Sequence, residues 1–130
     1  MDKQYYPVEI EEKWSKIWAE RVISNKDSED SFSQVIPPPN VTGTLHMGHS
    51  FQYAIMDFYT RYNHMAGKDA HWQVGSDHAG IATQMVVENN LAKKDITRNE
   101  LGREKFLDEV WSWKDYSEEK ITSQIKRLGC

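Results

Sequence analysis

The sequence predicts an α/β fold in which parallel strands are joined by crossover helices and preceded by an N-terminal helix. The spacing of apolar residues along the chain predicts elements in the order helix, strand, helix, strand, helix, helix. A strand–helix–strand unit of this length implies a parallel crossover. The 130 residues are enough for one domain with its own core, or for part of a larger one.

The composition argues against several classes of function. A net charge of -4 does not suit a dedicated nucleic-acid surface, which would be basic. No apolar run is long enough to span a bilayer, and the first residues lack the core of a signal peptide. The single cysteine, Cys130, excludes an internal disulfide. We therefore expect a cytoplasmic protein with no membrane partner.

Residues 1–31 are predicted to form an N-terminal helix and a polar linker. Pro7 suits the first turn of a helix, where its missing N–H costs nothing. The polar segment Ser24–Asp30 follows as the linker, and residues 32–130 form the second unit. One apolar stripe at helical spacing marks the helix: Ile10, Trp14, Ile17 and Trp18.

Two short strands are predicted in the second unit. The first, Phe32–Ile36, ends at Pro37, because proline cannot donate to a central ladder. The second, Ala70–Val74, precedes a sharp turn. The helix between them closes at Gly67. Seven apolar residues fall on one face of that helix: Met47, Phe51, Ala54, Ile55, Phe58, Tyr62 and Met65.

Two further helices are predicted after the second strand. One runs from Ile81 to about Leu91. Thr97 and Glu100 form a capping box that opens a long helix, with a break near Tyr116. The apolar residues of this helix are Leu101, Phe106, Val110, Ile121, Ile125 and Leu128. Gly129 reads as its C-cap, where a parallel sheet would place another strand, so we expect the chain to be truncated.

The segment GTLHMGHS, which begins at Gly43, predicts a phosphate site. It nearly matches the pattern G-x-x-x-x-G-K-[ST], with His49 in the lysine position. His46 and His49 share one face at a helix N-terminus, where free N–H groups and the helix dipole favour anions. Gly43 permits the turn into the helix, and Gly48 permits close approach of a ligand. Simpler interpretations are cap residues or half of a zinc site, completed by His64, His71 or His78.

The segment GSDHAGIATQ, Gly75 to Gln84, contains a second candidate group. Asp77 follows the second strand, and ligands of parallel sheets bind at the C-terminal ends of strands, so both loops are expected to face one pocket. A carboxylate beside a phosphate site binds Mg²⁺ or a substrate ammonium. The simpler interpretation of Asp77 is a helix N-cap.

These segments resemble a known family. His46-Met47-Gly48-His49 is similar to the HIGH motif of class I aminoacyl-tRNA synthetases, here within Pro39–His49. The strings PPPNVTGTLHMGH and GSDHAGIATQ, with the entry helix VEIEEKWSKIW, resemble the valine-specific branch. The resemblance covers essentially the whole chain. It implies that residues 32–130 are the first half of a Rossmann-type catalytic domain, ending before the editing insertion and the KMSKS half.

The resemblance also implies a reaction and a set of site residues. Valine would be activated with ATP, accompanied by Mg²⁺, to valyl-adenylate, and then transferred to tRNA(Val). A monomer without protein-bound metal is expected, and this segment alone should be inactive or very weak. The implied catalytic residues are His46 and His49. The residues implied to bind ATP are Thr42, Gly43, His46, Gly48 and His49. The residues implied to bind the amino acid are Pro37, Pro38, Asn40 and Asp77.

Three alternatives remain beside the valine-specific enzyme. The isoleucine and leucine relatives usually carry Asp, a cysteine or alanine, then His-Gly after the second strand, whereas DHAGIATQ favours valine. A small HxGH nucleotidyltransferase should carry a lysine or serine loop near its C-terminus, and EEKITSQIKRLGC contains none. A non-catalytic binding module for nucleotide or partner is the third.

Overall fold

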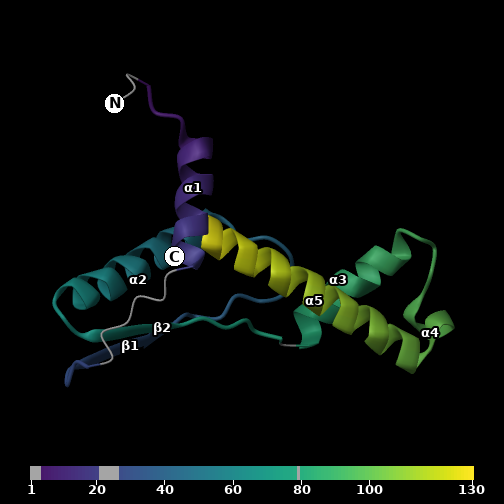
Figure 1. The fold of residues 1–130 in the computed structure, drawn as a ribbon. Helices are drawn as coiled ribbons and strands as arrows, with labels where there is room; N and C mark the ends of the chain where they lie inside the picture. The colour runs from purple at the N-terminus through teal and green to yellow at the C-terminus, as the bar shows by residue number, and fades with distance from the viewer. Residues whose placement is uncertain (1–3, 21–26, 79) are drawn as a thin grey trace.

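The computed structural model describes residues 4–20, 27–78 and 80–130, and it confirms the α/β fold (Figure 1). Both strands lie within one residue of their predicted positions. Residues 21–26, which include the first three residues of the expected linker, lie outside the described residues. The elements are α1 (Pro7–Ala19), β1 (Ser31–Val35), α2 (Met47–Met65), β2 (Asp69–Gln73), α3 (Gly80–Ala92), α4 (Arg98–Leu101) and α5 (Arg103–Leu128).

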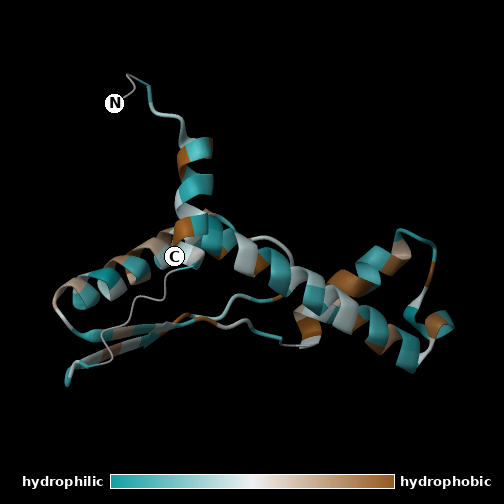
Figure 2. Cartoon of the chain, viewed as in Figure 1, coloured by the Kyte–Doolittle hydropathy of each residue, from teal (hydrophilic) through white to brown (hydrophobic). Residues whose placement is uncertain are grey.

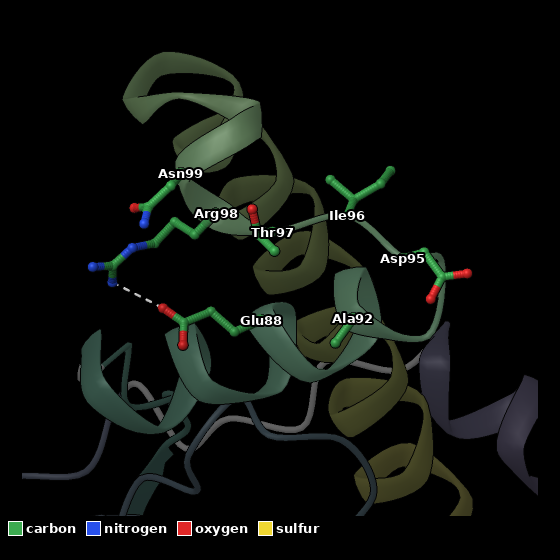
Figure 3. Close-up of a pocket in the computed structure, with 7 residues that line it drawn as sticks. All are labelled: Glu88, Ala92, Asp95, Ile96, Thr97, Arg98 and Asn99. Carbon is green, nitrogen blue, oxygen red and sulfur yellow. Dashed lines mark hydrogen bonds and ion pairs between the residues drawn. The ribbon is translucent and has the colours of Figure 1, made fainter.

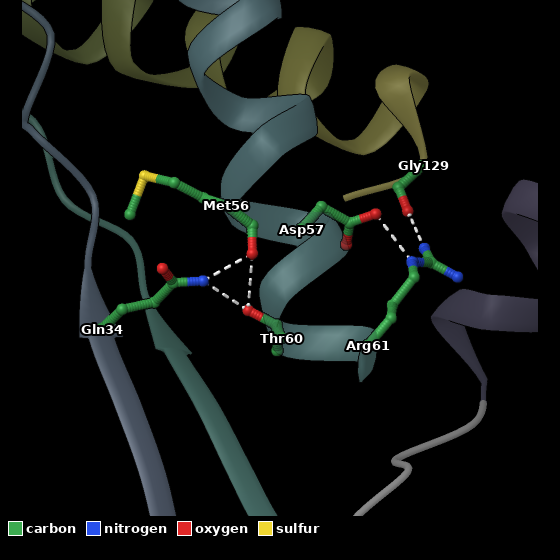
Figure 4. A network of polar contacts seen from close by, with 6 residues as sticks. All are labelled: Gln34, Met56, Asp57, Thr60, Arg61 and Gly129. Atoms are coloured by element: carbon green, nitrogen blue, oxygen red, sulfur yellow. Dashed lines mark hydrogen bonds and ion pairs between the residues drawn. The ribbon is translucent and has the colours of Figure 1, made fainter. Parts of the chain in front are cut away.

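The sheet confirms the predicted parallel crossover through α2. β1 and β2 pair in parallel, with Ser31 opposite Asp69 and Val35 opposite Gln73. The Gln34 side-chain amide donates to the backbone carbonyl of Met56 and to Thr60 Oγ1, which attaches β1 to α2 (Figure 4). The crossover helix is therefore held on the sheet by polar contacts as well as by packing.

Helix α5 runs from α4 to the place where α1 and α2 lie (Figure 1). Near its C-terminus, Ile121 and Ile125 pack with Ile36 and Tyr53 in one buried cluster. Near its N-terminus, Phe106 packs with Val87 and Leu91 of α3 in a second cluster. Hydrophobic and hydrophilic residues alternate along the helix, as a helix with one packed face requires (Figure 2). One helix thus contributes to both cores.

The end of α5 also meets α1 and α2. Arg61 of α2 pairs with Asp57 and donates to the backbone carbonyl of Gly129 (Figure 4). Its guanidinium carbon lies 5.3 Å from the ring centroid of Trp18 on α1, within range of a cation–π contact. A single arginine therefore joins three helices. None of the helices in the described part of the chain has the length and apolar character needed to cross a bilayer.

The predicted break in the long helix was misplaced. Thr97 and Glu100 do form the capping box, but the helix that they open, α4, ends at Leu101. The interruption is Gly102, whose φ of +80° lies in the left-handed region that side chains disfavour. α5 then runs without a break through Tyr116. A conformationally permissive glycine, and not the region of Tyr116, sets the boundary.

The apolar face of α2 points away from the sheet. Met47, Phe51 and Met65 are 82%, 71% and 87% exposed, and Ile55, Phe58 and Tyr62 are exposed as well. The residues that α2 buries are Tyr53 and Asn63, on the opposite side. Spacing identified the stripe correctly, but the sheet contacts the more polar face.

Candidate functional site

The histidine pair lies at the N-terminal end of α2 and caps it. His46 is the N-cap residue, and its Nδ1 accepts the backbone N–H of Gly48 at 3.1 Å. His49 Nδ1 accepts the backbone N–H of His46 at 3.2 Å, which completes a reciprocal capping box. A Cβ at Gly48 would lie 2.9 Å from His46 Cε1, so glycine is needed between the rings. The interpretation of the pair as cap residues is confirmed.

Capping also determines which nitrogen of each ring can meet a ligand. Both Nδ1 atoms accept hydrogen bonds, so the proton of each neutral imidazole sits on Nε2. The two rings are stacked with centroids 3.8 Å apart. The cap therefore leaves two Nε2–H donors side by side at the positive end of a 19-residue helix. Capping and phosphate binding are compatible roles for these histidines.

The surroundings of His49 favour its neutral form. Partial burial lowers the pKa of His49 below its ordinary value of 6.5, and repulsion from a charged His46 lowers this pKa further. The His49 ring also lies 6.0 Å from the ring of Tyr53, which is fully buried. An anion bound beside His49 would act in the opposite direction and raise the pKa of His49.

We expect His49 of this chain to titrate below 6.5, with its neutral proton on Nε2. Because its pKa is lower in the folded state than in the unfolded state, the folded chain binds fewer protons, and stability should fall as pH falls through 6.5. The ¹⁵N shifts of both ring nitrogens, followed by NMR from about pH 5 to 8, measure the midpoint and the tautomer. A midpoint at or above 6.5, or a proton on Nδ1, would contradict the arrangement.

The two predicted loops meet through their backbones. Asn40 and Asp77 form an isolated parallel bridge, in which Asp77 N–H donates to Pro39 O at 2.8 Å and Val41 N–H donates to Asp77 O at 3.2 Å. Prolines 37–39 have no N–H to donate, so pairing stops after the strands and resumes at Asn40. The bridge confirms that the two loops converge at the C-terminal ends of the strands. That they face one pocket stays a prediction.

The remaining predicted residues differ in their surroundings. Gly43 has a φ of +143°, which confirms the expected turn at a position that favours glycine. Thr42 is exposed, and its N–H donates to the backbone carbonyl of Asn40 at 2.8 Å. Pro37 and Pro38 are exposed, as is Asn40, whereas Pro39 is buried and Asp77 is half-buried. The exposed prolines and Asn40 thus form an open, rigid surface beside Asp77.

Three side chains of α5 that were not among the predicted site residues hold these loops. Gln124 Oε1 accepts the N–H of Leu45 at 2.9 Å, and Trp113 Nε1–H donates to Val41 O at 2.9 Å. Glu118 Oε1 accepts the Ser76 hydroxyl at 3.0 Å. The spacing of the sequence contains a signal for two of them, because one helix face carries Trp113, Ser117, Ile121 and Gln124. A pattern based on apolar residues alone does not include the polar residues of that face, such as Gln124.

Two cavities in the described residues lie away from the predicted site. One of about 600 Å³ lies between α3 and α4, where Arg98 pairs with Glu88 at 2.8 Å (Figure 3). Another of about 360 Å³ lies between α3 and α5 and is lined in part by Trp113 and Tyr116. Among the described residues, no group of three or more His, Cys, Asp or Glu side chains is placed to hold a metal ion.

Comparison with known proteins gives consistent matches. Residues 9–130 match the family described as tRNA synthetases class I (I, L, M and V). The chain is 59% identical over 126 residues to a valine--tRNA ligase of Acinetobacter baylyi, 52% over 132 to one of Francisella tularensis, and 53% over 133 to one of Neisseria meningitidis serogroup A. These alignments cover 96%, 99% and 100% of the chain, but it spans only 13% or 14% of the length of these relatives.

Proposed function

We propose, from the premise that this chain belongs to the class I tRNA synthetases of the isoleucine, leucine, methionine and valine group, that it forms the first half of the catalytic site of a valine--tRNA ligase. The choice of valine is supported by relatives that are more than half identical along nearly the whole chain. The reaction joins valine to ATP as valyl-adenylate with release of pyrophosphate, and valine then passes to tRNA(Val).

One observation carries this proposal: the bridge between Asn40 and Asp77. The bridge places Asp77, the one carboxylate of the segment Gly75 to Gln84, beside Val41. The N-cap residue of α2, His46, follows Val41 by five residues. An adenylate-forming enzyme needs an amino-acid ammonium site and a phosphate site at adjoining positions. The backbone pairing supplies that adjacency without relying on flexible side chains.

On the phosphate side, the Nε2–H groups of His46 and His49 donate to ATP phosphate oxygens. Gly48 and Gly43 let the phosphates approach the backbone, and Thr42 lies on the same loop. The helix N-terminus adds its partial positive charge. Mg²⁺ accompanies ATP as part of the substrate, bound through the phosphate oxygens.

On the amino-acid side, the Asp77 carboxylate binds the valine ammonium by a charge-assisted hydrogen bond. Pro37, Pro38 and Asn40 line the same edge, where the proline rings form a surface that cannot rearrange. The valine carboxylate oxygen attacks the α-phosphorus, and the bond to pyrophosphate breaks. This chain supplies positioning and charge stabilisation, with no protein nucleophile.

A chimera tests the proposal. This chain replaces the 126-residue segment that it matches in the Acinetobacter baylyi enzyme, and amino-acid-dependent ATP–pyrophosphate exchange is measured with valine, isoleucine and threonine. We expect exchange that depends most strongly on valine. Preference for isoleucine would refute the substrate assignment, and absence of exchange with all three amino acids would refute the synthetase role of the segment.

A further inference from the structure

The segment leading into α2 is held from α5 by Gln124. The hydrogen bond from Leu45 N–H to Gln124 Oε1 joins residues 79 positions apart, and Leu45 directly precedes the N-cap His46. Gln124 itself lies next to Ile125 and one turn after Ile121, both of which are buried in the core. The core therefore fixes Gln124, and Gln124 fixes the direction in which the chain enters the histidine cap.

The proline loop is held from the same helix by Trp113. Its indole N–H donates to the carbonyl of Val41, a residue that is fully buried. The N–H of Val41 donates to Asp77 O, so Trp113 contacts the residue through which the two loops are joined. Val41 is thus bound on one side by α5 and on the other by the Asp77 loop.

The Asp77 loop has its own contact with α5. The Ser76 hydroxyl donates to Glu118 Oε1, and Glu118 Oε2 pairs with Lys114 Nζ at 2.6 Å. Trp113, Glu118 and Gln124 therefore hold three separate segments of the site from one continuous helix. Trp113 and Gln124 are separated by roughly 16 Å along the axis at 1.5 Å per residue, which keeps the segments at a fixed spacing.

We propose that α5 sets the relative position of the two half-sites, with Gln124 positioning the phosphate-binding cap and Trp113 positioning the amino-acid loop. Neither residue touches a reacting atom. The inference rests on the proposed function above and adds a division of labour to it. Loss of Gln124 should impair ATP use, and loss of the Trp113 N–H should impair amino-acid use.

Kinetics of the chimera test this division. Gln124→Met removes the acceptor for Leu45 N–H, and we expect about a tenfold rise in KM for ATP with KM for valine within about twofold. Gln124→Glu keeps an acceptor oxygen and should stay within about threefold of the unmodified chimera. Trp113→Phe keeps an aromatic ring but loses the N–H, and should raise KM for valine about tenfold with little change for ATP. Thr122→Met, at an exposed position of α5, is the matched control.

A purely structural role would give a different result. The variants would then lose kcat in proportion to their loss of thermal stability, with no separation between the two substrates, and Gln124→Glu would give no rescue. Loss of kcat without a split between the two substrates overturns the inference, and so does absence of rescue in Gln124→Glu. If the unmodified chimera shows no valine-dependent exchange, the proposed function fails first and this inference fails with it. Exchange without the split between substrates overturns this inference alone.

A second measurement uses the 130-residue chain directly. Amide hydrogen exchange at Leu45 should accelerate at least about tenfold in Gln124→Met but not in Gln124→Glu, because only the first variant removes the acceptor. Exchange at Asp77 should be unaffected in both, since its N–H donates to Pro39 O. Unchanged protection of Leu45 in Gln124→Met would overturn the contact on which the inference depends.

Discussion

Replacement of His49 by alanine is expected to lower kcat for valine-dependent exchange about 10²–10³-fold, the usual cost of losing one donor aimed at charge that develops in a transition state. The variant loses the Nε2–H and also the Nδ1 acceptor that caps His46 N–H. The cap contributes about 1 kcal/mol to folding, so the chain should unfold only a few degrees earlier. Exchange kinetics and thermal unfolding of the chimera separate the two effects.

His49→Asn is the matched control for the alanine variant. The asparagine Oδ1 can replace Nδ1 as the capping acceptor, but no donor stands where Nε2–H was. We expect thermal stability to recover in His49→Asn while exchange stays low. If exchange recovers together with stability, the histidine serves the helix alone and its assignment to the phosphates is wrong.

Asp77→Asn is expected to raise KM for valine by about 30-fold or more, because removing one charge from a hydrogen-bonded charge pair that the bound substrate buries costs about 2–5 kcal/mol. The loop itself should keep its position, since the backbone N–H and carbonyl of Asp77 make the bonds to Pro39 and Val41. KM for ATP should stay within about twofold. Steady-state exchange with varied valine measures both constants.

Asp115→Asn provides the comparison for Asp77. Asp115 is an exposed carboxylate on α5 that pairs with Lys114 Nζ at 3.2 Å, and removing its charge should leave both KM values unchanged. A similar KM for valine in Asp77→Asn and in Asp115→Asn would show that Asp77 does not bind the ammonium. The Asp77 loop would then serve only to hold the proline segment.

Sequence patterns located the elements that carry the site. Proline placed the end of β1, helical spacing placed α2 and α3, and the order of elements implied the parallel pairing that brings Asn40 to Asp77. These features depend on local preferences of the chain, which a sequence expresses directly. The capping role of the histidines was likewise available from their position at a helix start.

Features that depend on packing between distant segments could not be predicted from such local patterns. The spacing of apolar residues predicted a stripe on α2 that includes Phe51 and Phe58, but spacing does not show which face of the helix contacts the sheet. In the structure, the face with Tyr53 and Thr60 contacts the sheet. The break at Gly102 required knowing its φ. The contacts of Trp113 and Gln124 join residues 72 and 79 positions apart, so no local sequence pattern predicts them.

Those long separations have a consequence for the time at which the site forms. A ribosome adds about 5–20 residues per second, so Gln124 is synthesised roughly 4–16 s after Leu45, whereas a helix such as α2 forms in about a microsecond. During that interval the capped helix can exist while its entry segment and the proline loop lack their partners on α5. The proposed binding site is therefore completed late in folding, by contacts of high sequence separation that form slowly.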